Sequence, residues 1–159
     1  MIDRRVLLGA GAATASAALA NAASAHTPYS GDGASEVLQA YRRLINRHDF
    51  DLLEQQVIAH DAVFVFSNLR HEGIAAIRSN FERTWSILPD EVYSMSDVVW
   101  LFSCDEHAAC TLRYHYSGKT TEGRRMEGGG QGVLIFGRRQ GQWRLMLEQL
   151  TPDTRRNSA

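Results

Sequence analysis

Several polar side chains with acid–base chemistry lie within or beside the apolar segments of this sequence. The candidates for catalysis are Tyr41, Asp61, His115 and Glu148. A carboxylate or an imidazole can take a proton from a substrate, and a tyrosine hydroxyl can donate a hydrogen bond to it. In an apolar cavity such groups would form a cluster with shifted pKa values. If Asp61 is only a turn residue and Tyr41 only a core residue, the cluster is smaller.

Arg113 and His115 occupy alternate positions of the apolar segment 108–116, and Glu148 lies in a second apolar segment. Side chains of a strand alternate between its two faces, so Arg113 and His115 share one face. The alternation does not decide whether that face lines a cavity, where Arg113 would bind a ligand, or faces water. Both interpretations stay open for these three residues.

Aromatic side chains are candidates for the wall of a small-molecule site. Those that we expect to line a cavity are Phe64, Phe66, Trp85 and Trp100. A small-molecule site is usually a concave apolar pocket with a few polar groups. Ordinary core packing is the alternative for most of these rings, and Trp85, in a segment with helical periodicity, is the strongest wall candidate.

Cys104 and Cys110 flank the turn formed by Asp105 and Glu106. A two-residue turn places the cysteines on opposite faces of a hairpin, and a three-residue turn places them diagonally on one face, where a disulfide is marginal. The sequence leaves open whether they are bridged.

The six histidines show no zinc-like spacing, and the glycine-rich run 128–132 lacks the lysine of a phosphate-binding loop. We therefore expect no metal and no cofactor.

The amino-terminal segment has the pattern of an export signal. Arg4 and Arg5 precede an alanine-rich apolar run, and Ala23-Ser24-Ala25 forms a small-residue cleavage site. The run is short and weakly apolar for a helix that spans a bilayer core of about 30 Å. We predict a twin-arginine-type signal peptide over residues 1–25, a bacterial protein that is periplasmic or secreted, and no stable membrane insertion after the signal is removed.

The elements that would position these side chains follow from the spacing of apolar residues. Residues 26–34 are polar and predict a flexible lead-in. Helical spacing follows over residues 35–45, 50–57 and 74–88. A period of two predicts a strand over 62–67, closed by a turn over 68–73, and four strands over 92–104, 108–116, 127–138 and 142–150. The tail, residues 152–159, is polar and predicts disorder.

The order α-α-β-α-β-β-β-β predicts one α+β domain over residues 35–151. Short turns join the last four strands, which favours an antiparallel meander, and three helices can cover only one face of it. We expect a cone-shaped curved antiparallel sheet with the three N-terminal helices packed on one face. The open face of the sheet would pack against a second copy in a homodimer.

Two short motifs add a family resemblance to this order. Residues 73–78 (GIAAIR) enter a helix after a strand, and residues 141–145 (GQWRL) open the last strand. In these motifs and in its order of elements, the chain resembles the nuclear transport factor 2-like superfamily, in particular its SnoaL-like branch. The resemblance covers residues 35–151 and implies a cone with a cavity. It implies no single activity, because the superfamily holds isomerases, dehydratases, cyclases and binding proteins.

One departure from the family concerns the last strand. Many relatives carry a His-x-His pair there, whereas this chain has Leu147-Glu148-Gln149, so a role of that pair is not inherited. In ketosteroid-isomerase relatives a carboxylate base works with a tyrosine and a protonated aspartate. The nearest candidates in this chain are Tyr41, Asp61 and Glu148.

Composition limits the class of partner. A formal net charge of −1 disfavours nucleic acid. We predict an exported SnoaL-like domain that binds a hydrophobic small molecule in its cavity. The alternative is a cofactor-free isomerase, dehydratase or cyclase that uses general acid–base catalysis in the same cavity. A third possibility is a domain that serves only in assembly.

Overall fold

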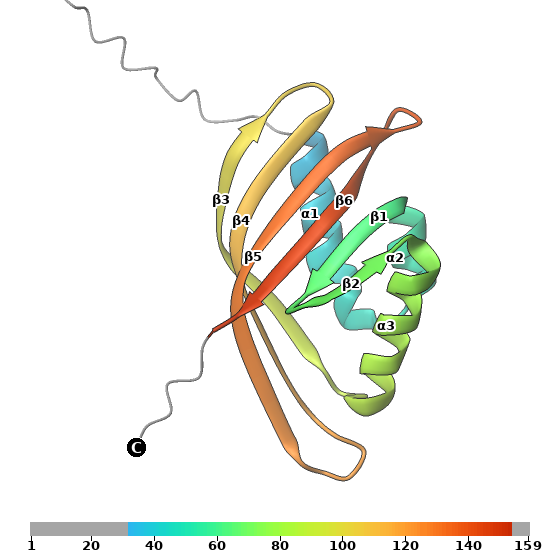
Figure 1. Ribbon diagram of the computed structural model, residues 1–159, viewed down its shortest axis with the longest axis vertical. Coiled ribbons are helices and arrows are strands. Elements are labelled where there is room, and N and C mark those ends of the chain that lie inside the picture. Colours follow the sequence, from blue (N-terminus) through green and yellow to red (C-terminus); the bar gives the residue numbers. More distant parts are fainter. Residues whose placement is uncertain (1–31, 154–159) are drawn as a thin grey trace, which may run out of the picture.

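The computed structural model describes residues 32–153 (Figure 1). The predicted signal peptide and most of the predicted lead-in and tail lie outside the described residues. Helix α1 spans Asp32–Leu44, so the last residues of the predicted lead-in are helical. A 3-10 turn over Ile45–Arg47 links α1 to α2, Phe50–Gln56, and α3 spans Ile74–Ile87.

The helices form where apolar side chains recur at helical spacing. In α1, Val37, Leu38, Tyr41 and Leu44 are buried on one face. At the start of α2, the Asp49 carboxylate accepts a hydrogen bond of 3.3 Å from the backbone N–H of Leu52. The apolar spacing therefore predicted all three helices to within a few residues.

Six strands form one curved sheet. They are β1 (Ile58–Phe66), β2 (Leu69–Glu72), β3 (Val92–Ser103), β4 (His107–Lys119), β5 (Arg125–Arg139) and β6 (Gln142–Pro152). The strand order is β2-β1-β6-β5-β4-β3. Strands β3 to β6 form the expected antiparallel meander. The α+β fold with a curved sheet is therefore confirmed.

Two features of the sheet differ from the expectation. Strand β1 pairs with β6 in parallel, so the sheet is mixed and not purely antiparallel. The segment expected to be only a turn contains β2, which forms a hairpin with β1. Both arise from pairing that no local turn motif indicates, since β1 and β6 are far apart in the chain and β2 is short and mostly exposed.

The helices lie on one side of the curved sheet, and none of the described elements covers the other face (Figure 1). Register places Phe64, Leu134 and Glu148 opposite one another in adjacent strands, so their side chains point to the same, inner face. Alternation then places Arg113 and His115 on the outer face, where both are exposed.

Glycines on the inner face of β5 allow the sheet to pack closely where it bends. A Cβ on Gly128 would lie 2.7 Å from the ring of Tyr116, and one on Gly130 would lie 2.0 Å from the carbonyl oxygen of Thr151. These positions tolerate no side chain without movement of their neighbours. The glycine-rich run is thus part of strand β5, where the neighbouring strand approaches closely.

The two cysteines flank a short turn, in which the backbone N–H of Cys104 donates to the carbonyl of His107 at 2.8 Å. Cys104 is exposed, Cys110 is buried, and both are free thiols. Burial raises the pKa of the Cys110 thiol to about 11.

Candidate functional site

The inner face of the sheet and the helices enclose a cavity of about 880 Å³. Most of its wall is apolar or aromatic, and its aromatic members are Tyr41, Phe66, Phe81, Trp85, Tyr93, Tyr114 and Tyr116. Its carboxyl groups are those of Glu91, Glu127, Glu148 and Asp153. A cavity of this size with few polar groups is typical of a site for a small organic molecule.

The most buried carboxyl group of this cavity is that of Glu148 on β6, a residue that is 1% exposed. Its Oε2 accepts a hydrogen bond of 2.9 Å from the Tyr41 hydroxyl of α1. Its Oε1 has no hydrogen-bond partner among the described residues. An unpaired buried polar atom costs about 1–3 kcal/mol, and a hydrogen bond to this oxygen would offset that cost.

Burial determines the protonation state of Glu148. Desolvation raises the pKa of its carboxyl to about 8, and the hydrogen bond from Tyr41 acts in the opposite direction. Burial and the neighbouring Glu148 charge also raise the pKa of Tyr41 well above its ordinary value. At neutral pH, Glu148 is therefore mostly a neutral acid that can donate a proton, with a pKa near the working pH of a general acid or base.

Tyr93 is a third polar group of the cavity, and the sequence analysis missed it. Its hydroxyl is buried and has no hydrogen-bond partner among the described residues, and its ring stacks on Tyr114 with a centroid distance of 6.1 Å. Burial and the Glu148 charge raise the pKa of Tyr93 well above its ordinary value, and both residues line the same cavity. Tyr93 pairs with Tyr116 in the β3–β4 register, which brings the Tyr93 ring to the inner face of the sheet. This position could not be predicted from the sequence without knowing the register.

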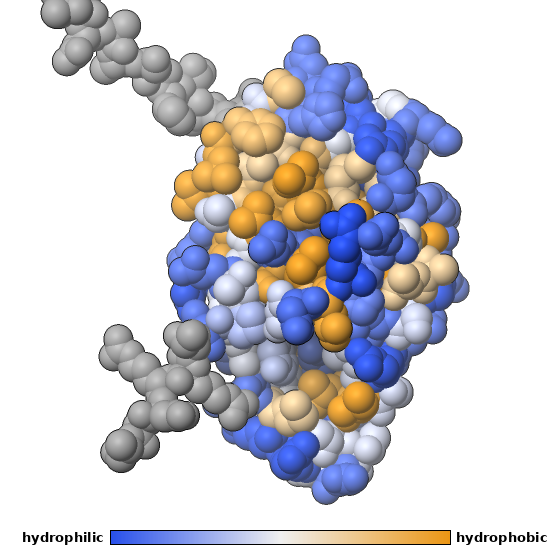
Figure 2. All heavy atoms as spheres, viewed as in Figure 1, coloured by the Kyte–Doolittle hydropathy of each residue, from blue (hydrophilic) through white to orange (hydrophobic). Residues whose placement is uncertain are grey.

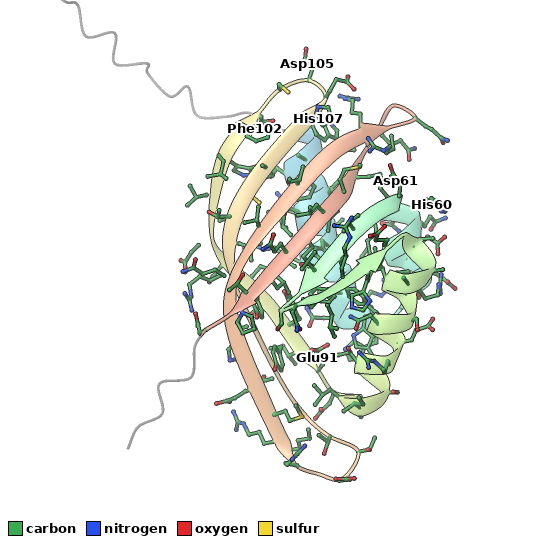
Figure 3. The ribbon with its side chains drawn as sticks, viewed as in Figure 1. His60, Asp61, Glu91, Phe102, Asp105 and His107 are labelled. Carbon is green, nitrogen blue, oxygen red and sulfur yellow. The ribbon has the colours of Figure 1, made fainter. Side chains whose placement is uncertain are left out.

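Glu91 is a second carboxyl of the cavity that the sequence analysis missed. It lies just before β3, between the sheet and α3 (Figure 3). Desolvation raises the pKa of the Glu91 carboxyl above its ordinary value. A hydrogen bond from the Trp85 side chain acts in the opposite direction and is the smaller effect. The His48 ring stacks on Trp85 at 5.0 Å and contacts the Glu91 carbonyl oxygen at 3.1 Å. The backbone and the side chain of Glu91 are thus both held in place.

The structure brings two of the four catalytic candidates together and leaves the other two outside the cavity. Tyr41 and Glu148 form the buried pair. Asp61 lies at the outer edge of the molecule beside His60 (Figure 3) and accepts hydrogen bonds of 3.1–3.2 Å from the Arg139 guanidinium, which lower its pKa. His115 points away from the cavity on the outer face of β4.

The predicted ligand-binding residues divide in the same way. Phe66 and Trp85 line the cavity. Phe64 is fully buried in the core behind it, and Trp100 packs against Phe136 at 5.7 Å, away from the lining residues. Arg113 lies on the outer face and forms an ion pair of 2.5 Å with Asp153.

Two features of residues 32–153 bear on metal binding and on contact with a membrane. There, no three His, Cys, Asp or Glu side chains are grouped as the ligands of a metal ion would be. In the same part of the chain, no helix is both long enough and apolar enough to cross a membrane.

A curved sheet and the helices on one side of it enclose a cavity with a buried carboxyl group. This arrangement defines the class of protein: an α+β cone of the nuclear transport factor 2 type. Within this class, residues 38–146 match the model of the SnoaL-like domain. The chain belongs to the SnoaL-like domain family. No functionally curated protein matches the sequence.

Solved structures share this fold at low sequence identity. A nuclear transport factor 2-like superfamily protein from Salmonella enterica is 13% identical with a TM-score of 0.68, over 78% of this chain and 91% of that chain. A Novosphingobium aromaticivorans protein provisionally named an aromatic ring hydroxylase is 16% identical with a TM-score of 0.67, over 76% and 86% of the two chains. Another protein of that organism, provisionally named a scytalone dehydratase, is 15% identical with a TM-score of 0.64, over 76% and 81%. At these identities the likeness concerns the fold alone.

Proposed function

We propose that this protein binds a hydrophobic small molecule in the cavity around Glu148. The observation that carries the proposal is the unpartnered Glu148 Oε1 in a cavity of about 880 Å³ with a mostly apolar wall. The apolar wall would supply affinity through burial, and the few polar atoms would orient the ligand. A ligand with a hydrogen-bonding oxygen would satisfy both Glu148 and the Tyr93 hydroxyl.

Binding of the neutral dye Nile red tests this proposal. Its fluorescence should rise with the wild-type protein, and Thr84→Trp should abolish the rise because Thr84 lines the cavity and a tryptophan there fills it. Ser86→Trp is the matched control, since Ser86 lies on the same helix but is exposed to solvent. Equal dye binding by both variants would refute the proposal.

A second candidate function, proton transfer on the bound molecule, is favoured by the Glu148 pKa of about 8. As a carboxylate, Glu148 would remove a proton from a carbon next to a carbonyl. The resulting neutral acid would return the proton at another atom, which gives an isomerisation, or to a leaving hydroxyl, which gives a dehydration and releases water. The Tyr93 hydroxyl would donate to the carbonyl oxygen as negative charge develops there. The name of the Novosphingobium dehydratase is compatible with this chemistry.

Hydrogen–deuterium exchange next to the carbonyl of 2-phenylcyclohexanone tests proton transfer, with proton NMR in D₂O as the measurement. We expect the wild type to accelerate exchange, with a rate that rises with pH up to about 8 and then levels as Glu148 becomes fully ionised. Glu148→Gln should abolish the acceleration, and Asp61→Asn should retain it. Acceleration that survives Glu148→Gln would exclude Glu148 as the base.

We also propose a homodimer that forms through the uncovered face of the sheet. Figure 2 shows hydrophobic side chains gathered on this face, and β3 exposes Val99 by 57%, Leu101 by 54% and Phe102 by 53%. A contiguous apolar patch on a sheet face is typical of an interface. In sedimentation velocity, Leu101→Lys should reduce the dimer to a monomer, whereas Glu122→Lys, at an exposed turn, should not. A monomeric wild type would contradict this assembly.

Export remains a proposal that rests on the sequence of residues 1–25. If the twin-arginine signal is used, the protein from a bacterial periplasm begins at His26, and Arg4→Lys combined with Arg5→Lys leaves it unprocessed in the cytoplasm. Intact-mass measurement of both fractions decides this point.

A further inference from the structure

We propose that the molecule bound in this cavity carries an aromatic ring and a protonated amine, and that Glu91 binds the ammonium group. This inference rests on the proposed small-molecule site and names the class of its ligand. It follows from the charge and the shape of the wall around Glu91, which differ from those around Glu148.

Glu91 has no counter-ion in the part of the chain that the structure describes. Among the described residues, no ion pair includes its carboxylate, and the Trp85 side chain is its hydrogen-bond donor. A carboxylate has about four lone-pair sites, so it retains capacity to accept further hydrogen bonds. A partly buried carboxylate without a cation is unfavourable, and a bound ammonium group would offset that cost.

The other carboxyl groups of the cavity do not have this property. Glu127 pairs with Arg125 at 3.2 Å, and Asp153 pairs with Arg113 at 2.5 Å. Glu148 is mostly neutral at pH 7 because it is fully buried. Glu91 is therefore the partly exposed carboxyl group of the described lining that forms no ion pair with another described residue. Burial raises the pKa of this carboxyl group, and a bound ammonium group would favour its charged form.

The surrounding wall suits a cation of moderate size. Seven aromatic rings line the cavity, and an ammonium group is attracted to the face of such a ring. Arg83 is the cationic residue among the described lining residues; it is exposed at the end of α3 and donates to the Asn80 side chain at 3.3 Å. The negative charge of a carboxylate ligand would be repelled by Glu91, and the described lining has no buried cation to neutralise that charge. The wall therefore disfavours carboxylate ligands.

The two polar regions of the cavity also define the ends of the ligand. Glu148 and Tyr93 offer hydrogen-bond donors at neutral pH, which suits a carbonyl or hydroxyl oxygen, and Glu91 offers an acceptor. A ligand that reaches both would carry its amine toward Glu91 and its oxygen toward Glu148. The aromatic part would lie between them against the rings of the wall.

Three probes with one skeleton test the charge preference: tryptamine, tryptophol and indole-3-propionate, which end in an ammonium, a hydroxyl and a carboxylate. Isothermal titration calorimetry at pH 7 should give at least tenfold tighter binding of tryptamine than of the other two. Glu91→Gln should reduce this preference to about twofold or less. Glu127→Gln, which changes a carboxylate already paired with Arg125, is the matched control and should keep the preference.

The outcomes separate this inference from the proposed function. If tryptophol or indole-3-propionate binds as tightly as tryptamine, the amine inference is wrong and the small-molecule site remains. If Glu91→Gln keeps the full preference, Glu91 is not its origin and the inference is also wrong. If none of the probes binds and Nile red does not bind either, both the inference and the proposed site fail.

Discussion

Two carboxyl groups, Asp61 and Glu148, lie in separate depressions of similar size, and their environments make them chemically different. Asp61 lies in a groove of about 700 Å³ lined mostly by charged and amide side chains, where the Arg139 guanidinium lowers its pKa. Glu148 lies in a cavity of about 880 Å³ with a mostly apolar wall, where burial raises its pKa to about 8. Both were candidates for a catalytic base. Only the environment of Glu148 keeps a proton available near neutral pH.

The largest expected difference between the two regions is in the pH dependence of stability. Glu148 keeps its proton up to about pH 8 when folded and loses it near its ordinary value of 4.5 when unfolded. Between these values the folded state binds more protons, so the free energy of unfolding falls as pH rises, by about 1.4 kcal/mol per pH unit and about 5 kcal/mol in total. Urea unfolding at a series of pH values measures this slope.

Glu148→Gln should flatten that slope because glutamine does not titrate. Asp61→Asn should leave that slope in place. The pKa of Asp61 is lowered in the folded state, so its contribution to the free energy of unfolding depends on pH in the opposite direction: it is present above the unfolded pKa and is lost as pH falls. A wild-type stability that is constant between pH 5 and pH 8 would show that Glu148 is not buried as described.

The second prediction concerns the wall that shapes the cavity. Gly130→Ala should destabilise the protein by about 3 kcal/mol, because the new Cβ would lie 2.0 Å from the Thr151 carbonyl oxygen. Nile red binding should weaken as the strands move apart. Gln131→Ala, at the adjacent exposed position, is the control and should change the free energy of unfolding by less than about 0.5 kcal/mol. Similar effects of the two substitutions would contradict the close approach.

The third prediction concerns the hydrogen bond that holds Glu148. Tyr41→Phe removes the donor to Oε2, so we expect a loss of about 2 kcal/mol and a pKa of Glu148 above 8. The pH at which stability stops falling should then move upward. Tyr116→Phe, which changes a tyrosine of the same cavity that does not bond Glu148, should not move it.

The smallest expected effect belongs to the outer groove. Asp61→Asn breaks an exposed pair with Arg139, and such pairs contribute about 0.2–1 kcal/mol. The melting temperature should change little, and Nile red binding should not change. A large loss of dye binding in this variant would mean that the groove, and not the cavity, is the site.

Local patterns in the sequence predicted most of the fold. Tyr41 follows Val37 and Leu38 at helical spacing, so its place on the buried face of α1 was predictable. Period-two alternation predicted strands β3 to β6. The parallel pairing of β1 with β6 was not predictable, because it joins segments about 80 residues apart and depends on how the sheet closes around the helices.

The site was only partly predictable for a related reason. His115 and Glu148 both alternate with apolar neighbours, yet the register turns Glu148 inward and His115 outward. Glu91 and Tyr93 have no distinctive local pattern. They reach the cavity because the β3–β4 hairpin register and the contact with Trp85 bring them there, and neither relation is local in sequence.

The most direct test of the central claim is the pKa of Glu148 itself. With ¹³C-labelled glutamate, the carboxyl resonance that disappears in Glu148→Gln identifies this residue, and its shift against pH gives the pKa. A value of about 8 is the result that the buried, Tyr41-bonded carboxyl predicts. A value near 4.5, the ordinary value for glutamate, would contradict it and remove the basis for acid–base chemistry in the cavity.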